Sequence, residues 1–168
     1  MADNQQINVS HWLSAIESSL DEIAKTTLGF DGCFPGDART DSPELSGGYV
    51  ALVGQHTAVQ VAVAAEPAVC KQVAATLLCM EPNEADELTE ADVADALGEL
   101  VNMVAGGVKT QMASTDPGLS LGLPLVVHGR IEESSATQAA MRDAKLGPYD
   151  VTLVLVADAE AVKASMAA

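Results

Sequence analysis

Aromatic and basic residues are both scarce in this sequence. Phe, Trp and Tyr make up 3% of the 168 residues, and eight Lys and Arg stand against 24 Asp and Glu, giving a formal net charge of −16. Few rings are available to stack on nucleic-acid bases, and so negative a chain is repelled by a phosphate backbone. The composition therefore argues against nucleic-acid binding. It favours partners that present Lys, Arg or metal ions, with solubility or a saline habitat as the simpler explanation.

Cysteines and long apolar runs are also few. Cys33, Cys70 and Cys79 have no metal-ligand spacing, and Cys70 and Cys79 fall in an apolar helical segment, where we expect small buried hydrophobic residues. The sequence starts with no charged segment leading into an apolar run, and no apolar stretch is long enough to cross a bilayer. These features predict a reduced, soluble, cytoplasmic protein.

Hydrophobic residues make up 48% of the chain, and their periodicity predicts a single α+β domain over residues 1–168, with residues 1–7 as a flexible N-terminus. Helical spacing is expected over 8–28, 66–79, 90–111 and 159–168. Strands are expected over 48–53, 57–64, within 119–128, and over 149–157. The segment 29–48 is expected to be a long surface loop, and 130–145 is ambiguous between strand and loop. This order predicts helices packed on a mainly antiparallel sheet.

The expected helix over 90–111 carries the most informative pair of residues. Glu99 and Asn102 are three positions apart, so they project from one face of the helix. Thr89, followed by Asp92, is expected to cap the helix start. A carboxylate beside a carboxamide can hold a cationic group and orient a water molecule. The alternative is that both are ordinary polar residues on the wet face of a helix.

Other site chemistry has little support. The histidines His11, His56 and His128 are far apart, with no Cys or carboxylate at ligand spacing, so no metal site is expected. Gly106-Gly107 lies inside the expected helix and does not form a phosphate-binding loop between a strand and a helix. No nucleophile elbow is present. The Glu99/Asn102 pair is therefore the strongest candidate site.

The residues around this pair resemble a known family. Asp95-x3-Glu99-x2-Asn102, within the run Asp-Ala-Leu-Gly-Glu-Leu-Val-Asn-Met-Val-Ala-Gly, is similar to the signature helix of the CheC/CheX/FliY chemotaxis phosphatases. The downstream run 119–129, Leu-Ser-Leu-Gly-Leu-Pro-Leu-Val-Val-His-Gly, resembles that family as well. CheC and FliY members resemble two-site versions, whereas only Asn102 here has a Glu three residues earlier. The likeness, which extends from about Asn8 onward, therefore favours the CheX-like branch and a CheC/CheX-like fold.

The resemblance implies a function. Such proteins hydrolyse phospho-aspartate on a CheY-like receiver domain in chemotaxis or other two-component signalling, so this chain is expected to be a cytoplasmic hydrolase. By resemblance, the catalytic residues are Glu99, which would pair with a receiver lysine, and Asn102, which would orient the attacking water. Asp95 would play a supporting role, and the small Gly98 and Gly106 would permit close approach.

The family likeness also implies partners and cofactors. Mg²⁺ would come from the receiver domain, and no cofactor of the chain's own is expected. A homodimer joined through the sheets is expected. One alternative is a non-catalytic module that binds a receiver domain or a flagellar-switch partner. Another is an acidic domain for an unrelated small molecule. The role of the 29–48 segment is left open.

Overall fold

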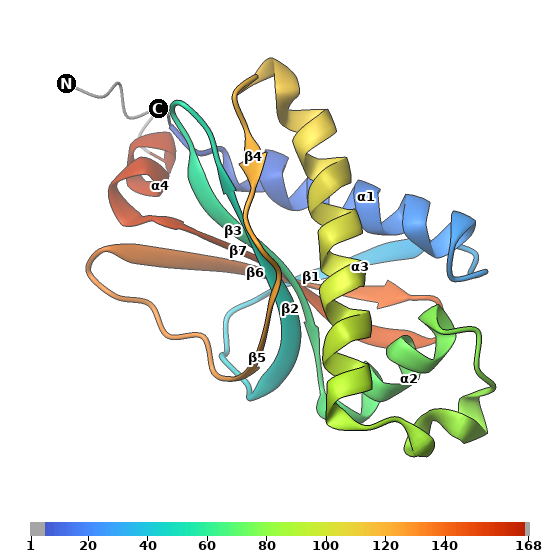
Figure 1. Ribbon diagram of the computed structural model, residues 1–168. Helices are drawn as coiled ribbons and strands as arrows, with labels where there is room; N and C mark the ends of the chain where they lie inside the picture. Colours follow the sequence, from blue (N-terminus) through green and yellow to red (C-terminus); the bar gives the residue numbers. More distant parts are fainter. Residues whose placement is uncertain (1–5, 167–168) are drawn as a thin grey trace.

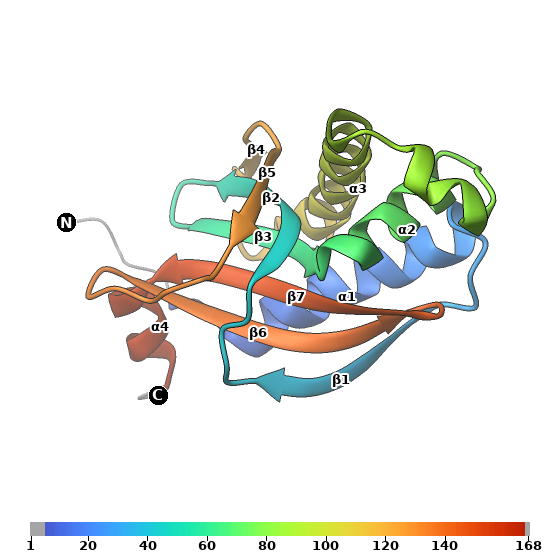
Figure 2. The same cartoon turned by 90° about the horizontal axis from the view of Figure 1, so that it is seen from below.

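The computed structural model describes residues 6–166, with the side chains of 163–166 excepted, and shows helices against one twisted sheet (Figures 1 and 2). The helices are α1 (Val9–Thr26), α2 (Pro67–Leu77), α3 (Glu90–Gln111) and α4 (Ala159–Met166), with short 3-10 helices η1 (Pro82–Glu87) and η2 (Met112–Ser114). The strands are β1 (Cys33–Arg39), β2 (Leu45–Val53), β3 (Ala58–Ala65), β4 (Ser120–Leu121), β5 (Leu125–Gly129), β6 (Thr137–Leu146) and β7 (Tyr149–Asp158). The α+β prediction is confirmed.

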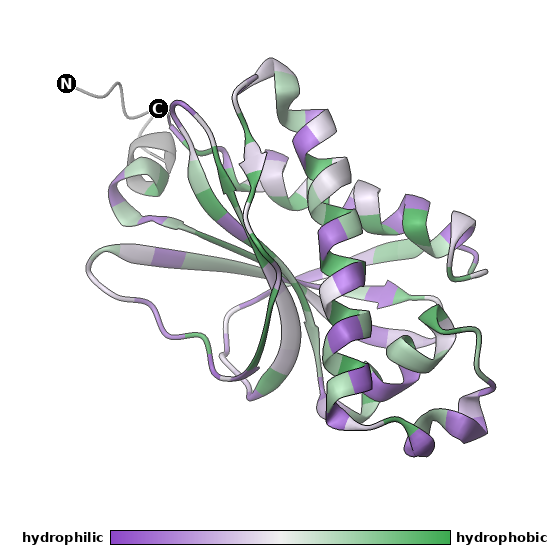
Figure 3. Cartoon of the chain, in the orientation of Figure 1, coloured by the Kyte–Doolittle hydropathy of each residue, from purple (hydrophilic) through white to green (hydrophobic). Residues whose placement is uncertain are grey.

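All strand pairs in the seven-stranded sheet are antiparallel, in the order β1-β6-β7-β3-β2-β4, and β5 also pairs with β2. Helices α1, α2 and α3 cover one face (Figure 2). Of the central strands, β3 is rich in Val and Ala and β7 in Val and Leu, which suits strands buried on both sides. In Figure 3 the sheet centre is largely hydrophobic, while η1, beside the start of α3, is largely hydrophilic.

The core lies between the sheet and the three helices. The apolar stripe of α1 is buried there, and its Trp12 is only 2% exposed. A smaller cluster forms on the other face of the sheet around Leu45, Ala62, Ala64 and Val154. Because side chains alternate along a strand, β3 contributes residues to both clusters. The core therefore holds the sheet rigidly beneath α3.

Two glycines allow the close packing that positions α3. A Cβ atom at Gly48 of β2 would lie 2.6 Å from the carbonyl oxygen of Leu97. A Cβ atom at Gly107 would lie 2.6 Å from Oγ of Ser19 on α1. Real Cβ contacts are essentially never so short, so both positions require glycine for the observed helix approach. α3 is thus seated tightly on β2 and α1.

A buried carboxylate ties the connection after α3 to the β2–β3 turn. Asp116 is fully buried and accepts hydrogen bonds from the backbone N–H groups of His56 (3.0 Å), Gly118 (3.2 Å) and Gln55 (3.3 Å). The hydrogen bond from His56 contributes most to holding the pKa of the Asp116 carboxyl below its usual range, and the other two act in the same direction. The contact fixes where the chain leaves α3 and turns toward β4.

Several predictions need correction. The segment 29–48 is not a long loop, because β1 forms within it and β2 begins at Leu45. β1 pairs with the distant β6, and β2 pairs with the neighbouring β3 and with the distant β5. The ambiguous segment 130–145 contains most of β6. Cys79 is exposed, not buried, and lies just after α2 with a left-handed φ of 57°. Cys70 is buried as expected.

Most of the expected flexible N-terminus, residues 1–7, lies outside the described residues. Ile7 is buried, and its N–H donates to the carbonyl oxygen of Ala161 at 3.2 Å. None of the described helices is both long and apolar enough to cross a membrane.

Candidate functional site

The start of α3 is fixed by a reciprocal cap. The Thr89 hydroxyl accepts a hydrogen bond from the Asp92 N–H (3.2 Å), and the Asp92 carboxylate accepts one from the Thr89 N–H (2.9 Å). Hydrogen bonding from Thr89 lowers the pKa of the Asp92 carboxyl. The predicted cap is confirmed, and it sets the first turn of the helix that carries the candidate pair.

Glu99 and Asn102 both project into solvent from the middle of α3. Their neighbours Leu100, Val101 and Val104 are buried against the sheet and α1, so the amphipathic pattern of α3 fixes which side faces outward. Asp95 is exposed on the same side. The structure therefore brings all three sequence-predicted polar residues onto one accessible face.

These residues line an open groove of about 450 Å³. One wall is α3, with Ala94, Asp95, Gly98, Glu99 and Asn102, and the other is formed by Pro124 and Val126. A carboxylate for a cation and an amide that both donates and accepts hydrogen bonds thus share one solvent-open hollow. Sequence reasoning did not place Pro124 and Val126 in the site, although both lie in the apolar run 119–129.

An irregularity between β4 and β5 places Pro124 in this wall. Leu121 pairs with Leu52 and Leu125 pairs with Tyr49, so the three residues between β4 and β5 lie opposite two residues of β2. Pro124 has no N–H to donate, and it sits in this bulge, where no ladder hydrogen bond is required of it. Leu123, at the tip, is 86% exposed. The bulge turns the proline ring toward α3.

The glycines on the site face are not required by the protein's own packing. A Cβ atom at Gly98 would meet Pro124 at 3.8 Å, an ordinary van der Waals distance. At Gly106 it would meet nothing within 4 Å. Gly98 is therefore covered by Pro124 at the wall of the groove, whereas Gly106 leaves open room on the outer side of α3.

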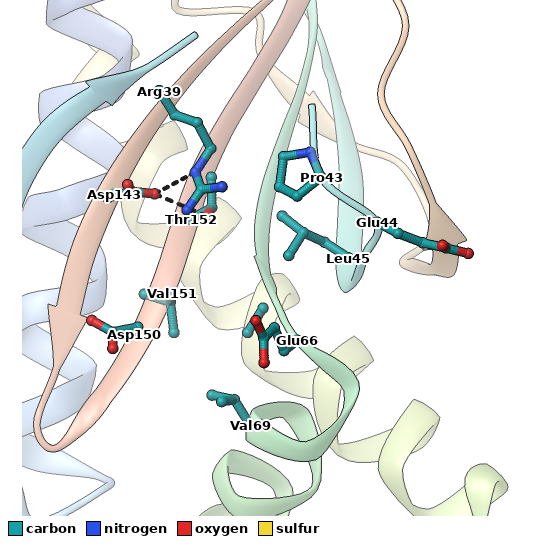
Figure 4. Close-up of a pocket in the computed structure, with 11 residues that line it drawn as sticks. Arg39, Pro43, Glu44, Leu45, Glu66, Val69, Asp143, Asp150, Val151 and Thr152 are labelled. Atoms are coloured by element: carbon teal, nitrogen blue, oxygen red, sulfur yellow. Dashed lines mark hydrogen bonds and ion pairs between the residues drawn. The ribbon is translucent and has the colours of Figure 1, made fainter. Parts of the chain in front are cut away.

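A separate hollow of about 270 Å³ lies between β6, β7 and the segment that joins β1 to β2 (Figure 4). Its one lining cation, Arg39, is already paired with a carboxylate. Arg39 Nε donates to Asp143 at 2.7 Å, and the same carboxylate accepts from the Thr152 hydroxyl at 3.2 Å. The hydrogen bond to Asp143 raises the pKa of Arg39. The ion pair between Arg39 and Asp143 therefore has a structural role: it anchors the end of β1 to β6.

The three histidines do not come together. His128 contacts Ser46 Oγ through Nδ1 (2.8 Å) and Glu44 through Nε2 (3.3 Å) at the edge of the sheet. Over residues 6–162, no group of three or more His, Cys, Asp or Glu side chains is placed to hold a metal ion.

Several solved structures share this fold. A CheC-like superfamily protein from Shewanella is 23% identical, with a TM-score of 0.69 over 90% of this chain and 99% of that one. Chemotaxis protein CheX from Vibrio vulnificus is 21% identical, with a TM-score of 0.67 over 88% and 98% of the two chains. The CheX–CheY–BeF3–Mg²⁺ complex from Borrelia burgdorferi matches at 20% identity and a TM-score of 0.68, over 94% and 99%. No curated protein matches the sequence.

The family model for the chemotaxis phosphatase CheX matches residues 46–142. The match runs from β2 to the middle of β6 and includes α3 and both walls of the groove. It covers more than half of the 168 residues. By this match, and with the fold in agreement, the chain belongs to the CheX family of chemotaxis phosphatases.

Proposed function

We propose that this protein accelerates the hydrolysis of phospho-aspartate on the receiver domain of a CheY-like response regulator. The observation that carries the proposal is the exposure of Glu99 and Asn102 in one groove of α3, in a chain of the CheX family. The Borrelia relative, whose structure contains CheY, BeF3 and Mg²⁺, supports a receiver domain as the partner.

Each of the two residues has a distinct part in the proposed mechanism. Phosphoryl transfer passes through a loose transition state, so catalysis depends on positioning and on charge stabilisation. The Glu99 carboxylate pairs with a lysine of the receiver domain and fixes the docking register. Asn102, nearly one helical turn further on, accepts a hydrogen bond from the attacking water and holds it in line with the phosphorus. An amide serves this role at any physiological pH, since it does not titrate.

The receiver domain supplies the remaining groups. Its Mg²⁺ neutralises charge on the phosphoryl oxygens, and its aspartate is the leaving group. This chain contributes no metal of its own to the proposed reaction. The open shape of the groove suits such a division, because the reacting atoms arrive on the surface of the partner.

The test is the decay of phosphorylated receiver domains with and without this protein. Asn102→Ala should lose about 10²–10³-fold in catalysed rate, the cost of removing one positioned hydrogen-bonding group, and should keep the unfolding midpoint of the wild type. Glu99→Ala should weaken docking as well as turnover. Lys109→Ala, on the same exposed side of α3 but outside the groove, is the matched control and should behave as the wild type does.

The outcomes separate catalysis from binding. Undiminished activity of Asn102→Ala contradicts the assignment of the water-positioning residue. If the wild-type protein binds a phosphorylated receiver domain without shortening its lifetime, the protein is an interaction module and not a phosphatase.

We also propose that the protein acts as a single-domain homodimer in the cytoplasm, where its free thiols stay reduced. Among the described strands, β1 lies at one edge of the sheet, and the two-residue β4 and the longer β5 lie at the other. β1 contains Pro35 and Asp37 and an irregular register, features that protect an edge from pairing. β5 begins Leu-Val-Val, and its Leu125 is 63% exposed. Pairing through β5 is therefore the favoured arrangement.

Light scattering tests the dimer. Leu125→Lys should shift the mass from dimer to monomer. Phe34→Lys, at a 56% exposed apolar residue of β1, is the matched control and should leave the mass unchanged. A wild-type monomer at micromolar concentration would contradict the proposal.

A further inference from the structure

A second groove lies beside the one that holds Glu99 and Asn102. It has a volume of about 580 Å³ and lies between α2, the first half of α3 and β5. Its apolar lining comes chiefly from Val93, Ala94 and Leu97 of α3 and from Val126 of β5. Ser46, Lys71, Glu90 and His128 add polar groups. Nothing in the proposed hydrolysis uses this groove.

The two grooves share a wall. Ala94 on α3 and Val126 on β5 line both of them, and β5 lies beside α3 in the fold (Figure 1). A folded domain seated on Glu99 also covers the second groove, because protein interfaces typically bury about 800 Å² on each partner. The occupant of one groove is therefore expected to reach the other.

Charge around the grooves indicates the chemistry of the occupant. Glu90, Asp95 and Glu99 line them, against the single cation of Lys71. A second copy of this chain seated in the grooves, rather than paired along the edge of β5, would bring like charge to the same place, since the whole chain carries −16. A surface with an apolar side chain flanked by Lys or Arg is complementary in both respects.

We propose that the second groove binds an apolar side chain, flanked by basic residues, on the same receiver domain whose phospho-aspartate meets Asn102. The groove sets the affinity for that partner and selects among receiver domains, while Glu99 and Asn102 act on the phosphoryl group. This inference rests on the proposed function. It adds a specificity determinant outside the Glu-x-x-Asn motif.

Ser46→Leu tests the second groove without altering the groove that holds Glu99 and Asn102. Ser46 lines the second groove only, and a leucine there fills space that the partner needs. KM for the phosphorylated receiver domain should rise tenfold or more, with kcat within about twofold of the wild type, because buried apolar anchors dominate interface affinity. Ser120→Leu is the control: Ser120 is exposed, lines neither groove and likewise has one side-chain hydrogen bond to lose, to Val53.

A charge variant tests the second half of the inference and still applies if Ser46→Leu fails to fold. Glu90→Lys, in the groove, should raise KM several-fold at low ionic strength and less at high salt. Glu87→Lys, at an exposed acid of η1 that lines neither groove, should change KM by less than twofold. Equal effects of the two substitutions would overturn the charge argument.

Binding to the BeF3⁻- and Mg²⁺-loaded receiver domain separates this inference from the phosphatase proposal. If the wild type binds, and Ser46→Leu weakens binding while Ser120→Leu does not, the groove is confirmed even where no dephosphorylation is seen. If the wild type dephosphorylates the receiver domain but Ser46→Leu keeps the KM of the control, the proposal for the second groove is wrong and the proposed phosphatase activity is supported. If Ser46→Leu instead dissociates a dimer with KM unchanged, the groove belongs to a second copy, which also overturns the proposal.

Discussion

Replacing Gly106 with alanine should stabilise the protein, whereas the same change at the adjacent Gly107 should destabilise it. Both glycines lie in α3, where glycine costs about 1 kcal/mol relative to alanine. A Cβ atom at Gly106 meets nothing within 4 Å, so Gly106→Ala should recover that amount in full. For a chain of 168 residues, about 1 kcal/mol corresponds to a rise in Tm of about 2–4 °C.

At Gly107 the same gain is outweighed by a clash. The new Cβ atom would lie 2.6 Å from Ser19 Oγ and 2.9 Å from Ser19 Cβ. Rotation of the hydroxyl cannot relieve the second contact, so the backbone of α1 must move. Ser19 Oγ also donates to the carbonyl oxygen of Ala15 (2.8 Å) and accepts from Gln111 (2.9 Å). Overpacking and strained buried hydrogen bonds together should leave a net loss of about 2 kcal/mol.

Urea unfolding of the wild type and the two variants, followed by the near-ultraviolet signal of Trp12 on α1, measures both changes. The free energies of unfolding of the two variants should differ by about 3 kcal/mol at unchanged m-value. Equal stabilities would refute the packing of α1 against α3, since the two substitutions differ only in what the added methyl group meets. Phosphatase activity at Gly106→Ala is a separate measurement: a loss there, despite a more stable fold, would show that the partner approaches this turn of α3.

The remaining predictions concern a buried carboxylate, a helix cap and the thiols. Because the folded-state pKa of Asp116 lies below its unfolded value, its stabilising contribution is complete above about pH 4 and is lost as pH falls through the folded pKa; the stability gap between wild type and Asp116→Asn should shrink over that range. Thr89→Ala should cost about 1 kcal/mol of unfolding free energy in a urea titration. Of the three cysteines, only exposed Cys79 should react with a thiol reagent in the native protein, because burial raises the pKa of Cys33 to about 12 and of Cys70 to about 11; rapid titration of a second thiol would contradict that packing.

The sequence predicts those elements whose residue pattern is local. α1 and α3 have uninterrupted amphipathic repeats, and α3 also has a cap at Thr89, so the predicted start of α3 at residue 90 is correct. β1 has no such pattern. Its sequence, Cys-Phe-Pro-Gly-Asp-Ala-Arg, has the composition of a loop and forms a strand only because β6 pairs with it from more than 100 residues away. β6 in turn is rich in Ala and charged residues and is held between β1 and β7. Tertiary pairing overrides weak strand propensity in both.

The candidate site, too, could be predicted only where its residues are close together in the sequence. Glu99 and Asn102 are neighbours on one helix, so their shared face follows from a spacing of three residues. Pro124 and Val126 approach that face only through the bulge after β4, which the register with β2 determines. The prediction that Cys79 is buried fails because it assumes a helix up to residue 79. α2 ends at Leu77, and at Cys79 the chain turns with positive φ and leaves the core.

The packing of the glycines in α3 argues that the site is built to be completed by another molecule. Gly107 is held by α1, so its lack of a side chain serves the fold. Gly98 and Gly106 cost helix stability, although a Cβ atom would fit at either position without a clash. The absence of side chains at Gly98, which lines the groove, and at Gly106, one turn beyond Asn102, leaves Glu99 and Asn102 projecting from the surface of α3. A partner can therefore bring a recessed reacting group, rather than a protruding one, up to the amide of Asn102. Such a shape suits a phosphorylated carboxylate lying at the bottom of its own domain's active site.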